Sequence, residues 1–355
     1  MTPRELCRSY LSSLTGSDPD VTARIDQVSI PTRRLGHSGI EVSAVGLGTM
    51  MFGSWGNTDV TECRRMVDVA LDAGVTLFDT ADIYDGGVAE EILGAALGRR
   101  RDRVVLATKV GLPMSERPDE RGLSRRWIVQ ECEASLRRLG TDHVDLLQMH
   151  RPDPGTPIDE TLGALDDLVR AGKVRAIGTS TFPAPLLEAL HARAGELGVA
   201  RPTSEQPPYS ILTRGIETDV VAAARRLDVG LVVWAPLNGG WLTGKYQTGS
   251  GGAASRANRK GEHFDHRDPE VRETKQGMVA ELFTIAAGAG MSLVQLALGF
   301  VLRDPVVASA LIGPRTLPQL VELLAAGPAD LPFDVIQAID RIVAPGVNVN
   351  PRNGD

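Results

Sequence analysis

From residue 42 onward, short apolar runs rich in β-branched residues alternate with longer amphipathic segments. Eight of these runs are nearly continuous in apolar residues, as strands buried on both faces of a parallel sheet are: 42–49, 75–81, 104–110, 144–150, 174–180, 202–206, 230–236 and 307–313. Segments of helical length lie between most of them, at 59–73, 88–98, 124–139, 158–171, 184–198 and 216–227. This alternation predicts βαβ units with right-handed crossovers.

Two architectures are built from such units, a doubly wound open sheet and a closed (β/α)8 barrel. The open sheet usually carries G-x-G-x-x-G after an early strand, but the nearest candidate, in 46–53, has Met51 in place of the third glycine. In a barrel, the carboxyl ends of all strands share one face, and that face carries the chemistry. Because polar residues end strand after strand here, the sequence favours a single-domain α/β TIM barrel over residues 32–345.

Three segments fall outside the alternating pattern. We expect residues 1–31 to be an N-terminal extension that is poorly ordered or loosely docked, and residues 346–355 to be a polar C-terminal tail. Residues 245–277 are polar and glycine-rich, and we expect them to form a long lid-like loop. Connections of that length are usually functional lids or disordered segments.

Four polar side chains lie in or directly after the predicted strands: Asp79 in 75–81, Tyr84 after it, Lys109 in 104–110 and His150 at the end of 144–150. A phenol has a pKa of about 10, and a neighbouring ammonium lowers it toward the working range. Lys109 can supply that charge, and Asp79 can pair with it, since an unpaired lysine at the end of an apolar strand is costly. His150 can donate a hydrogen bond to a substrate oxygen. The set suits protonation of a carbonyl oxygen while a nicotinamide cofactor delivers hydride, which no side chain can supply.

Several motifs in a fixed order carry a family resemblance. They are GVTLFDTADIY (74–84), TKVG (108–111), DLLQMHRPD (145–153), GKVRAIGTS (172–180), WAPLNGGWLTGKY (234–246) and ALIGPRTLPQLVE (310–322), with Gln206 between them. Over about residues 32–343 the chain resembles the aldo-keto reductase superfamily, in particular its bacterial branches that are also similar to potassium-channel β subunits. The resemblance implies NADPH-dependent reduction of an aldehyde or ketone. Tyr84 would be the general acid, Asp79 and Lys109 would tune it, and His150 would orient the carbonyl.

The resemblance also implies a cofactor site. Ser180 and Gln206 would bind the carboxamide, Trp234 would stack on the nicotinamide ring, and Arg315 and Thr316 would bind a 2′-phosphate at a helix N-terminus, where free N–H groups hold anions. The full set implied for NADPH/NADP+ is Gly48, Thr49, Met50, Asp79, Ser180, Thr181, Gln206, Trp234, Ala235, Pro236, Leu237, Gly239, Leu242, Lys245, Gly313, Arg315, Thr316, Gln319 and Glu322. Trp55, Tyr84 and His150 would line the substrate pocket.

Four positions depart from the family pattern. Thr181 stands where Asn usually follows the serine, so amide recognition would be weaker or rearranged, and Ala89 stands where relatives often have Ser. Asp85 replaces the Gly that often follows the catalytic Tyr, and its charge favours polar, neutral or cationic substrates over carboxylates. Gln319 holds the place of an Arg in many reductases, so a preference for NADP over NAD depends mainly on Arg315.

Composition and charge narrow the partners. The chain has 355 residues and a net charge of −7, which argues against broad binding to nucleic acid or to an anionic membrane. No apolar run has the length of a transmembrane helix, and the N-terminus lacks the apolar core of a signal peptide. Three cysteines, Cys7, Cys63 and Cys132, show no metal-binding or paired spacing, which predicts a reducing cytoplasm, with Cys63 and Cys132 as small buried hydrophobes.

No metal site is expected. His263, Asp265 and His266 are metal-ligating residue types, but they lie in the charged, glycine-rich stretch 245–277, which is typical of a solvated loop.

Two other functions remain open at this point. The chain can be an NADP(H)-binding regulatory or redox-sensing subunit with slow turnover, because channel β-like relatives keep the same four residues. It can also be a tailoring ketoreductase that acts on a sugar-nucleotide or a secondary metabolite. The expected partner is a small carbonyl compound, and both a monomer and a homo-oligomer are compatible with a helical barrel exterior.

Overall fold

The computed structural model describes residues 30–247 and 268–351. Its centre is a closed barrel of parallel strands in the order β10-β3-β4-β5-β6-β7-β8-β9. The strands are β3 Val45–Gly48, β4 Leu77–Asp79, β5 Val105–Val110, β6 Val144–Met149, β7 Val174–Ser180, β8 Ser204–Gln206, β9 Gly230–Val233 and β10 Val307–Ile312. Each lies within one of the eight predicted runs, so the single (β/α)8 barrel is confirmed.

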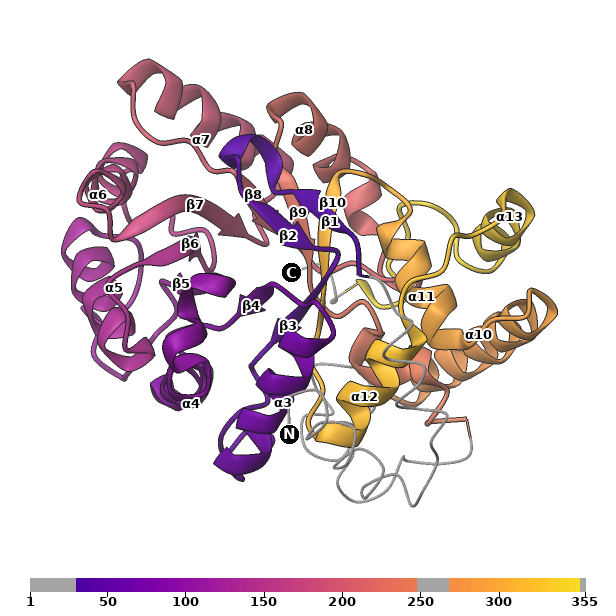
Figure 1. The fold of residues 1–355 in the computed structure, drawn as a ribbon. Coiled ribbons are helices and arrows are strands. Elements are labelled where there is room, and N and C mark those ends of the chain that lie inside the picture. The colour runs from indigo at the N-terminus through magenta and orange to yellow at the C-terminus, as the bar shows by residue number, and fades with distance from the viewer. Residues whose placement is uncertain (1–29, 248–267, 352–355) are drawn as a thin grey trace.

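Helices surround the strands, as Figure 1 shows. They are α3 Val60–Asp72, α4 Val88–Leu97, α5 Arg125–Leu139, α6 Ile158–Arg170, α7 Ala184–Leu197, α8 Val220–Leu227, α10 Pro269–Gly288, α11 Leu293–Leu302, α12 Leu317–Ala326 and α13 Phe333–Ile342. The six predicted segments correspond to α3 to α8, although α8 begins four residues later than predicted because a separate 3-10 turn, Gly215–Glu217, precedes it. Within the described ranges no single helix is long and apolar enough to cross a membrane, and α10 and α11 meet that criterion only as a pair bent by 92°.

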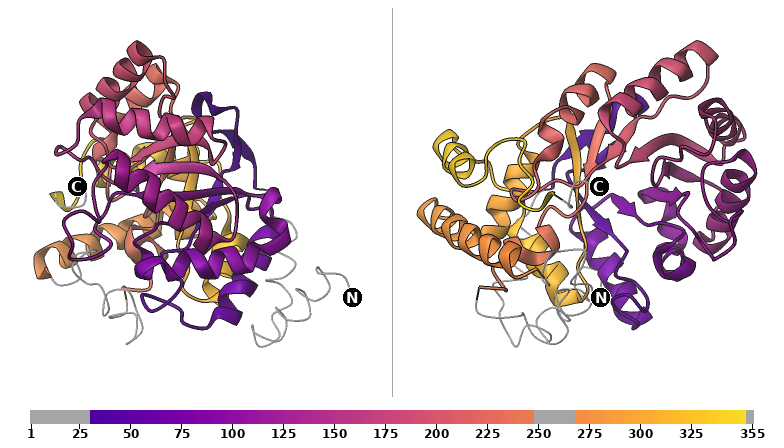
Figure 2. Two further views of the ribbon diagram at one scale, coloured as in Figure 1. Left: turned by 90° about the vertical axis from the view of Figure 1, so that its left-hand side faces the viewer. Right: turned by 180° about the vertical axis from the view of Figure 1, so that it is seen from behind.

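A short antiparallel hairpin, β1 Thr32–Arg34 and β2 Glu41–Ser43, precedes the barrel. It appears in indigo at one side of the molecule in Figure 2. Leu35 and Val42 of this hairpin pack with inward-facing strand residues such as Leu77 and Leu146 in one apolar cluster. The hairpin therefore closes the barrel at the end opposite the carboxyl ends of the strands.

The predicted strand 42–49 is two strands in the structure. The break is at Ala44, directly after Ser43, whose hydroxyl donates to the carbonyl of Val45 (2.7 Å) and accepts from the backbone N–H of Thr76 (2.9 Å). These side-chain bonds take the place of regular ladder bonds, so β2 belongs to the hairpin and β3 to the barrel.

The predicted lid-like loop 245–277 is wrong in its extent. Residues 269–277 form the first turns of α10, and the segment 248–267, with the predicted solvated His263, Asp265 and His266, lies outside the described residues. Lys275 is fully buried, and its ammonium donates to Oδ1 of Asn238 at 2.8 Å. The polar pattern that suggested a loop therefore belongs in part to a helix whose lysine is satisfied inside the protein.

The first residues of the predicted tail 346–355 pack against the loop between β8 and α8. Oδ1 of Asn348 accepts from the backbone N–H of Gly215 at 2.7 Å, and the N–H of Val349 donates to the carbonyl of Leu212 at 3.1 Å. Residues 352–355 lie outside the described residues. Up to residue 351, the tail is thus part of the fold.

Both cysteines in the described part of the chain are buried and unpaired, as predicted for Cys63 and Cys132. Burial is the main reason that the pKa of each thiol rises to about 12. Neither thiol is ionised at neutral pH, so both behave as small apolar residues.

Candidate active site

The polar residues of the site form one layer above the apolar interior of the barrel. Alternate side chains of a strand point the same way. On β4 the inward residues are Leu77 and then Asp79, and on β5 they are Ala107 and then Lys109. Leu77 and Ala107 belong to the apolar cluster inside the barrel, and Asp79 and Lys109 stand one step closer to the carboxyl face. The strand register therefore brings the acid and the amine together.

Lys109 is the centre of this layer. Its ammonium lies 2.6 Å from Oδ2 of Asp79, 2.7 Å from the carbonyl oxygen of Thr80 and 3.3 Å from the hydroxyl of Tyr84. Both ionised side chains are almost completely buried. Burial, the largest single effect, would lower the pKa of Lys109, but the charges of Asp79 and Tyr84 and the hydrogen bonds to both together outweigh it. The pKa is therefore raised, and Lys109 is an ammonium at neutral pH.

The second carboxylate oxygen of Asp79 is held by two amides. Nε2 of Gln206 donates to Oδ1 of Asp79 at 2.8 Å, and Nε2 of Gln148 donates to the same atom at 3.1 Å. The two amides also bond to each other at 3.1 Å. Gln148 was missed in the sequence, although a polar residue two positions before His150 in an otherwise apolar run was a signal for it.

Tyr84 lies in a short 3-10 turn, Tyr84–Gly87, between β4 and α4. Its ring is flanked by two aromatic rings: that of His150, at 6.0 Å between centroids in an edge-on arrangement, and that of Trp55, at 6.2 Å. The expected fall in its pKa is wrong. Burial raises the pKa of Tyr84 more than the charge of Lys109 lowers it, so the phenol is held in its protonated, hydrogen-bond-donating form.

His150 is neutral in this environment. Burial, helped by the nearby charges of Lys109 and Arg151, lowers the pKa of the imidazole well below its ordinary value. Nδ1 of the ring is buried and has no hydrogen-bond partner among the described residues. A neutral imidazole keeps one N–H that can be donated to a ligand.

Asp85 ties the tyrosine turn to the loop that follows β3. Its Oδ2 accepts from the backbone N–H of Ser54 at 2.7 Å, and its Oδ1 accepts from the Ser54 hydroxyl. Asp85 has a positive φ of 53°, and a Cβ at Gly53 would lie 2.3 Å from Oδ2, so both positions are shaped for this contact. The carboxylate of Asp85, which was expected to add a negative charge near the pocket, therefore accepts hydrogen bonds from Ser54 and fixes the loop that carries Trp55.

The same loop is bound to the start of α12 at its other end. Nδ2 of Asn57 donates to the carbonyl of Arg315 and to Oε2 of Glu62, both at 2.9 Å. The other oxygen of Glu62 accepts from the N–H of Leu317 at 2.9 Å. Neither Asn57 nor Glu62 was singled out in the sequence, because nothing in a local pattern shows a contact made across more than 250 residues.

Ser180 and Thr181 end β7 beside this layer. The Ser180 hydroxyl donates to the backbone carbonyl of Gln206 at 3.0 Å, and Arg151 lies 3.5 Å from it. Thr181 has a φ of 57°, unusual for a β-branched residue, and its buried hydroxyl has no partner among the described residues. Asn adopts this conformation more readily, which gives a physical reason for the residue that is usual here in relatives.

The remaining residues predicted to bind a cofactor lie on two loops and one helix start at the same face. Thr49 is buried, and its N–H and hydroxyl both donate to the carbonyl of Asp79, at 2.9 and 3.1 Å. Trp234 follows β9 and is half-buried. After Trp234 comes a turn in which Ala235 and Gly239 have positive φ. The same segment contains the other predicted residues Pro236, Leu237, Leu242 and Lys245. At the end of β3, Gly48 and Met50 flank Thr49.

The predicted phosphate site is the start of α12, which a further helix, α13, follows. Oε1 of Gln319 accepts from the N–H of Arg315 at 2.9 Å, and the Arg315 guanidinium has no partner among the described residues. Thr316 is the residue before the helix, the exposed Gly313 lies in the loop between β10 and α12, and Glu322 is an exposed residue of the helix. Because Glu62 already accepts from Leu317, a phosphate here would depend on Arg315 more than on free backbone N–H groups.

Comparison with known proteins agrees with this geometry. The family model described as "Aldo/keto reductase family" matches residues 44–344. The chain is 38% identical over 321 residues to "Uncharacterized oxidoreductase YrpG" of Bacillus subtilis (strain 168), covering 87% of this chain and 94% of the relative. It is 36% identical over 325 residues to "Probable voltage-gated potassium channel subunit beta" of Arabidopsis thaliana, covering 88% and 93% of the two chains. The protein of the same name from Oryza sativa subsp. japonica is 35% identical, with 88% and 95% covered.

Proposed function

The chain belongs to the aldo/keto reductase family, and we propose that it reduces an aldehyde or ketone to an alcohol with NADPH. One observation carries the proposal: the buried Lys109 ammonium contacts both Asp79, at 2.6 Å, and the Tyr84 hydroxyl, at 3.3 Å, beside a neutral imidazole. This is an arrangement for giving a proton to an oxygen that becomes negatively charged. We further propose that the protein acts in the cytoplasm.

Tyr84 is the general acid of this proposal. Its raised pKa keeps the phenol protonated in the resting site, ready to donate to a carbonyl oxygen that gains negative charge. The phenolate left behind is stabilised by the Lys109 ammonium, which is itself held by Asp79. The neutral His150 donates its N–H to the same carbonyl oxygen and orients it.

The residues around the barrel mouth fit a nicotinamide dinucleotide. Bound NADPH would supply the hydride for the carbonyl carbon. Ser180, Gln206 and the unpartnered hydroxyl of Thr181 would receive its carboxamide, and Trp234 its ring. The Arg315 guanidinium, which has no partner within 30–247 and 268–351, suits a 2′-phosphate and favours NADPH over NADH.

The direct test is the oxidation of NADPH, followed by absorbance, with a panel of aldehydes, ketones and keto-sugars. Because a general acid contributes about 10²- to 10⁴-fold, Tyr84→Phe should lose at least a hundredfold in kcat/KM on any carbonyl that the wild type reduces. Tyr209→Phe is the matched control, since the buried hydroxyl of Tyr209 bonds to Glu217, away from the four residues Asp79, Tyr84, Lys109 and His150 (the tetrad). Its kcat/KM should stay within a few fold of wild type. Equal rates for wild type and Tyr84→Phe would refute the assignment.

The cofactor preference has its own test. Arg315→Ala should raise the KM for NADPH at least tenfold and leave the KM for NADH nearly unchanged, since one charge-assisted contact to the 2′-phosphate is lost. An equal effect on both cofactors would remove the reason to prefer NADPH.

A second function is favoured by the names of the plant relatives. It is an NADP(H)-binding regulatory subunit that turns over slowly. Tight NADPH binding, seen by fluorescence, with no turnover on any panel member would support it over the reductase. A tailoring ketoreductase acting on a sugar-nucleotide or secondary metabolite would instead show turnover on the keto-sugars of the panel.

A further inference from the structure

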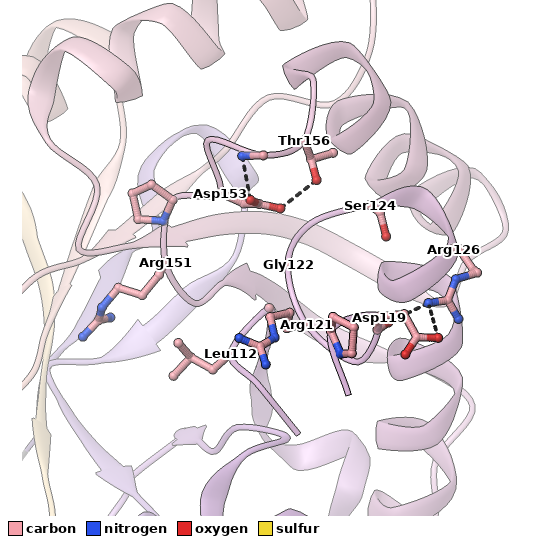
Figure 3. Close-up of a pocket in the computed structure, with 13 residues that line it drawn as sticks. Leu112, Asp119, Arg121, Gly122, Ser124, Arg126, Arg151, Asp153 and Thr156 are labelled. Carbon is pink, nitrogen blue, oxygen red and sulfur yellow. Dashed lines mark hydrogen bonds and ion pairs between the residues drawn. The ribbon is translucent and has the colours of Figure 1, made fainter. Parts of the chain in front are cut away.

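A cavity of about 520 Å³ lies between the loops that follow β5 and β6. Some of the residues between Gly111 and Arg126 and between Arg151 and Thr156 form its walls, and Figure 3 shows the side chains that line it. The first loop begins two residues after Lys109, and the second begins directly after His150. The cavity therefore shares the carboxyl face of the barrel with the tetrad.

The two acids in the cavity wall are satisfied. Asp153 accepts from the N–H of Leu123 (2.7 Å), the N–H of Gly155 (2.9 Å) and the hydroxyl of Thr156 (2.7 Å). Although burial opposes ionisation, these bonds hold the pKa of Asp153 below its ordinary value. Asp119 pairs with Arg126 at 3.2 Å and with Arg117 at 3.3 Å. Asp119 is thus paired with two arginines, and both oxygens of Asp153 are occupied by neutral donors.

Two guanidinium groups in the wall have donors to spare. Arg121 makes no hydrogen bond or ion pair with any residue in the described ranges 30–247 and 268–351. Arg151 uses one nitrogen, Nη1, for the carbonyl of His150 at 2.8 Å and for the Ser180 hydroxyl at 3.5 Å, and its other N–H groups have no partner among the described residues. The side chains come from different loops, and both line the cavity (Figure 3).

We propose that this cavity binds a carboxylate at the far end of the carbonyl substrate, with Arg121 and Arg151 as its partners. The inference rests on the proposed function and names its substrate class: aldehydes or ketones that also carry a carboxylate. Guanidinium groups match the planar, two-oxygen geometry of a carboxylate. Leu112 and Pro118 give the same cavity an apolar side for the carbon chain between the two ends. Asp85, the acidic residue that argued against such substrates, accepts hydrogen bonds from the neutral Ser54 and does not line this cavity.

The test compares two substrates that differ only in this charge, 4-carboxybenzaldehyde and methyl 4-formylbenzoate. Wild type should show a kcat/KM at least tenfold higher for the acid than for the ester. In Arg121→Ala this ratio should fall at least fivefold. Arg125→Ala is the control of equal charge change, because Arg125 pairs with Asp167 outside the cavity wall, and it should leave the ratio within twofold. A wild-type ratio near one, or a ratio that Arg121→Ala does not change, would overturn the proposal.

A binding measurement separates this proposal from the proposed function. Calorimetry with NADP+ present compares 4-(hydroxymethyl)benzoate with its methyl ester, so no turnover is needed. The acid should bind at least tenfold more tightly to wild type, and Arg121→Ala should remove most of that difference. If this holds while no aldehyde is reduced, the anion site stands and the reductase does not. Equal affinity for acid and ester would overturn the site even in an active enzyme.

Discussion

Replacing Asp79 by Asn should cost more stability than any surface ion pair in the protein. The change keeps the shape of the side chain and its bonds to Gln148 and Gln206 within reach, but it leaves the Lys109 ammonium buried without a counter-charge. Breaking a buried ion pair by removing one partner costs about 3–5 kcal/mol. That is a large part of the roughly 5–15 kcal/mol by which domains are stable.

The structure supplies two matched controls. In the double variant Asp79→Asn/Lys109→Met neither position carries a charge, so most of the lost stability should return, because the desolvation cost of the lysine disappears as well. Asp167→Asn removes an acid that pairs with Arg125 at the surface, where its side chain is 60% exposed, and it should cost less than about 1 kcal/mol.

The assay is urea unfolding at pH 7, followed by tryptophan fluorescence, with refolding from urea to check reversibility. The expected order of stability is wild type, Asp167→Asn, the double variant and then Asp79→Asn. The reasoning is refuted if Asp79→Asn lies within about 1 kcal/mol of wild type, or if the double variant is no more stable than the single one.

Three further predictions concern other parts of the molecule. Asp85→Asn and Ser54→Ala should each raise the KM for carbonyl substrates more than they lower kcat, because the loop carrying Trp55 loses its attachment beside Tyr84. If both variants lowered kcat equally and left KM unchanged, this prediction would be contradicted. Burial lowers the pKa of His191 to about 4, below its value in the unfolded chain, so the unfolded state binds a proton more readily than the folded state. Acidification from pH 6.5 to 4 should therefore remove up to about 3 kcal/mol of stability from wild type and less from His191→Gln. Unfolding curves at both pH values measure this difference. Thr181→Asn should raise the unfolding free energy by up to about 1 kcal/mol by relieving the positive φ, and unchanged or lower stability would count against strain at this residue.

The barrel and its polar layer were predictable because both depend on regular geometry. Eight apolar runs imply eight strands, and the alternation of side chains places Asp79, Lys109 and His150 on one face whatever the loops do. The same alternation pointed to Gln148, which was overlooked. Strand ends and helix starts were less predictable, since they depend on single hydrogen bonds such as those of the Ser43 hydroxyl.

The surroundings of the layer depended on contacts that a linear pattern does not show. Asp85 was expected to add a negative charge near the pocket, and its contact with Ser54 was not predicted because Ser54 lies on a different loop. The pKa of Tyr84 was expected to fall because the sequence reveals the neighbouring ammonium and not the extent of burial, which has the larger effect. The sequence likewise does not show that Arg121, and all of Arg151 but Nη1, lack hydrogen-bond partners among the described residues, because that depends on how the two loops fold.

The central claim is that this site transfers hydride directly to a carbonyl carbon while Tyr84 protonates the oxygen. The most direct test is a single turnover with NADPH deuterated at the transferring position of C4, followed by mass spectrometry of the alcohol. We expect one deuterium on the carbinol carbon with wild type and a rate at least a hundredfold slower with Tyr84→Phe. An alcohol whose new C–H hydrogen comes from solvent, or a Tyr84→Phe rate within tenfold of wild type, would contradict the account.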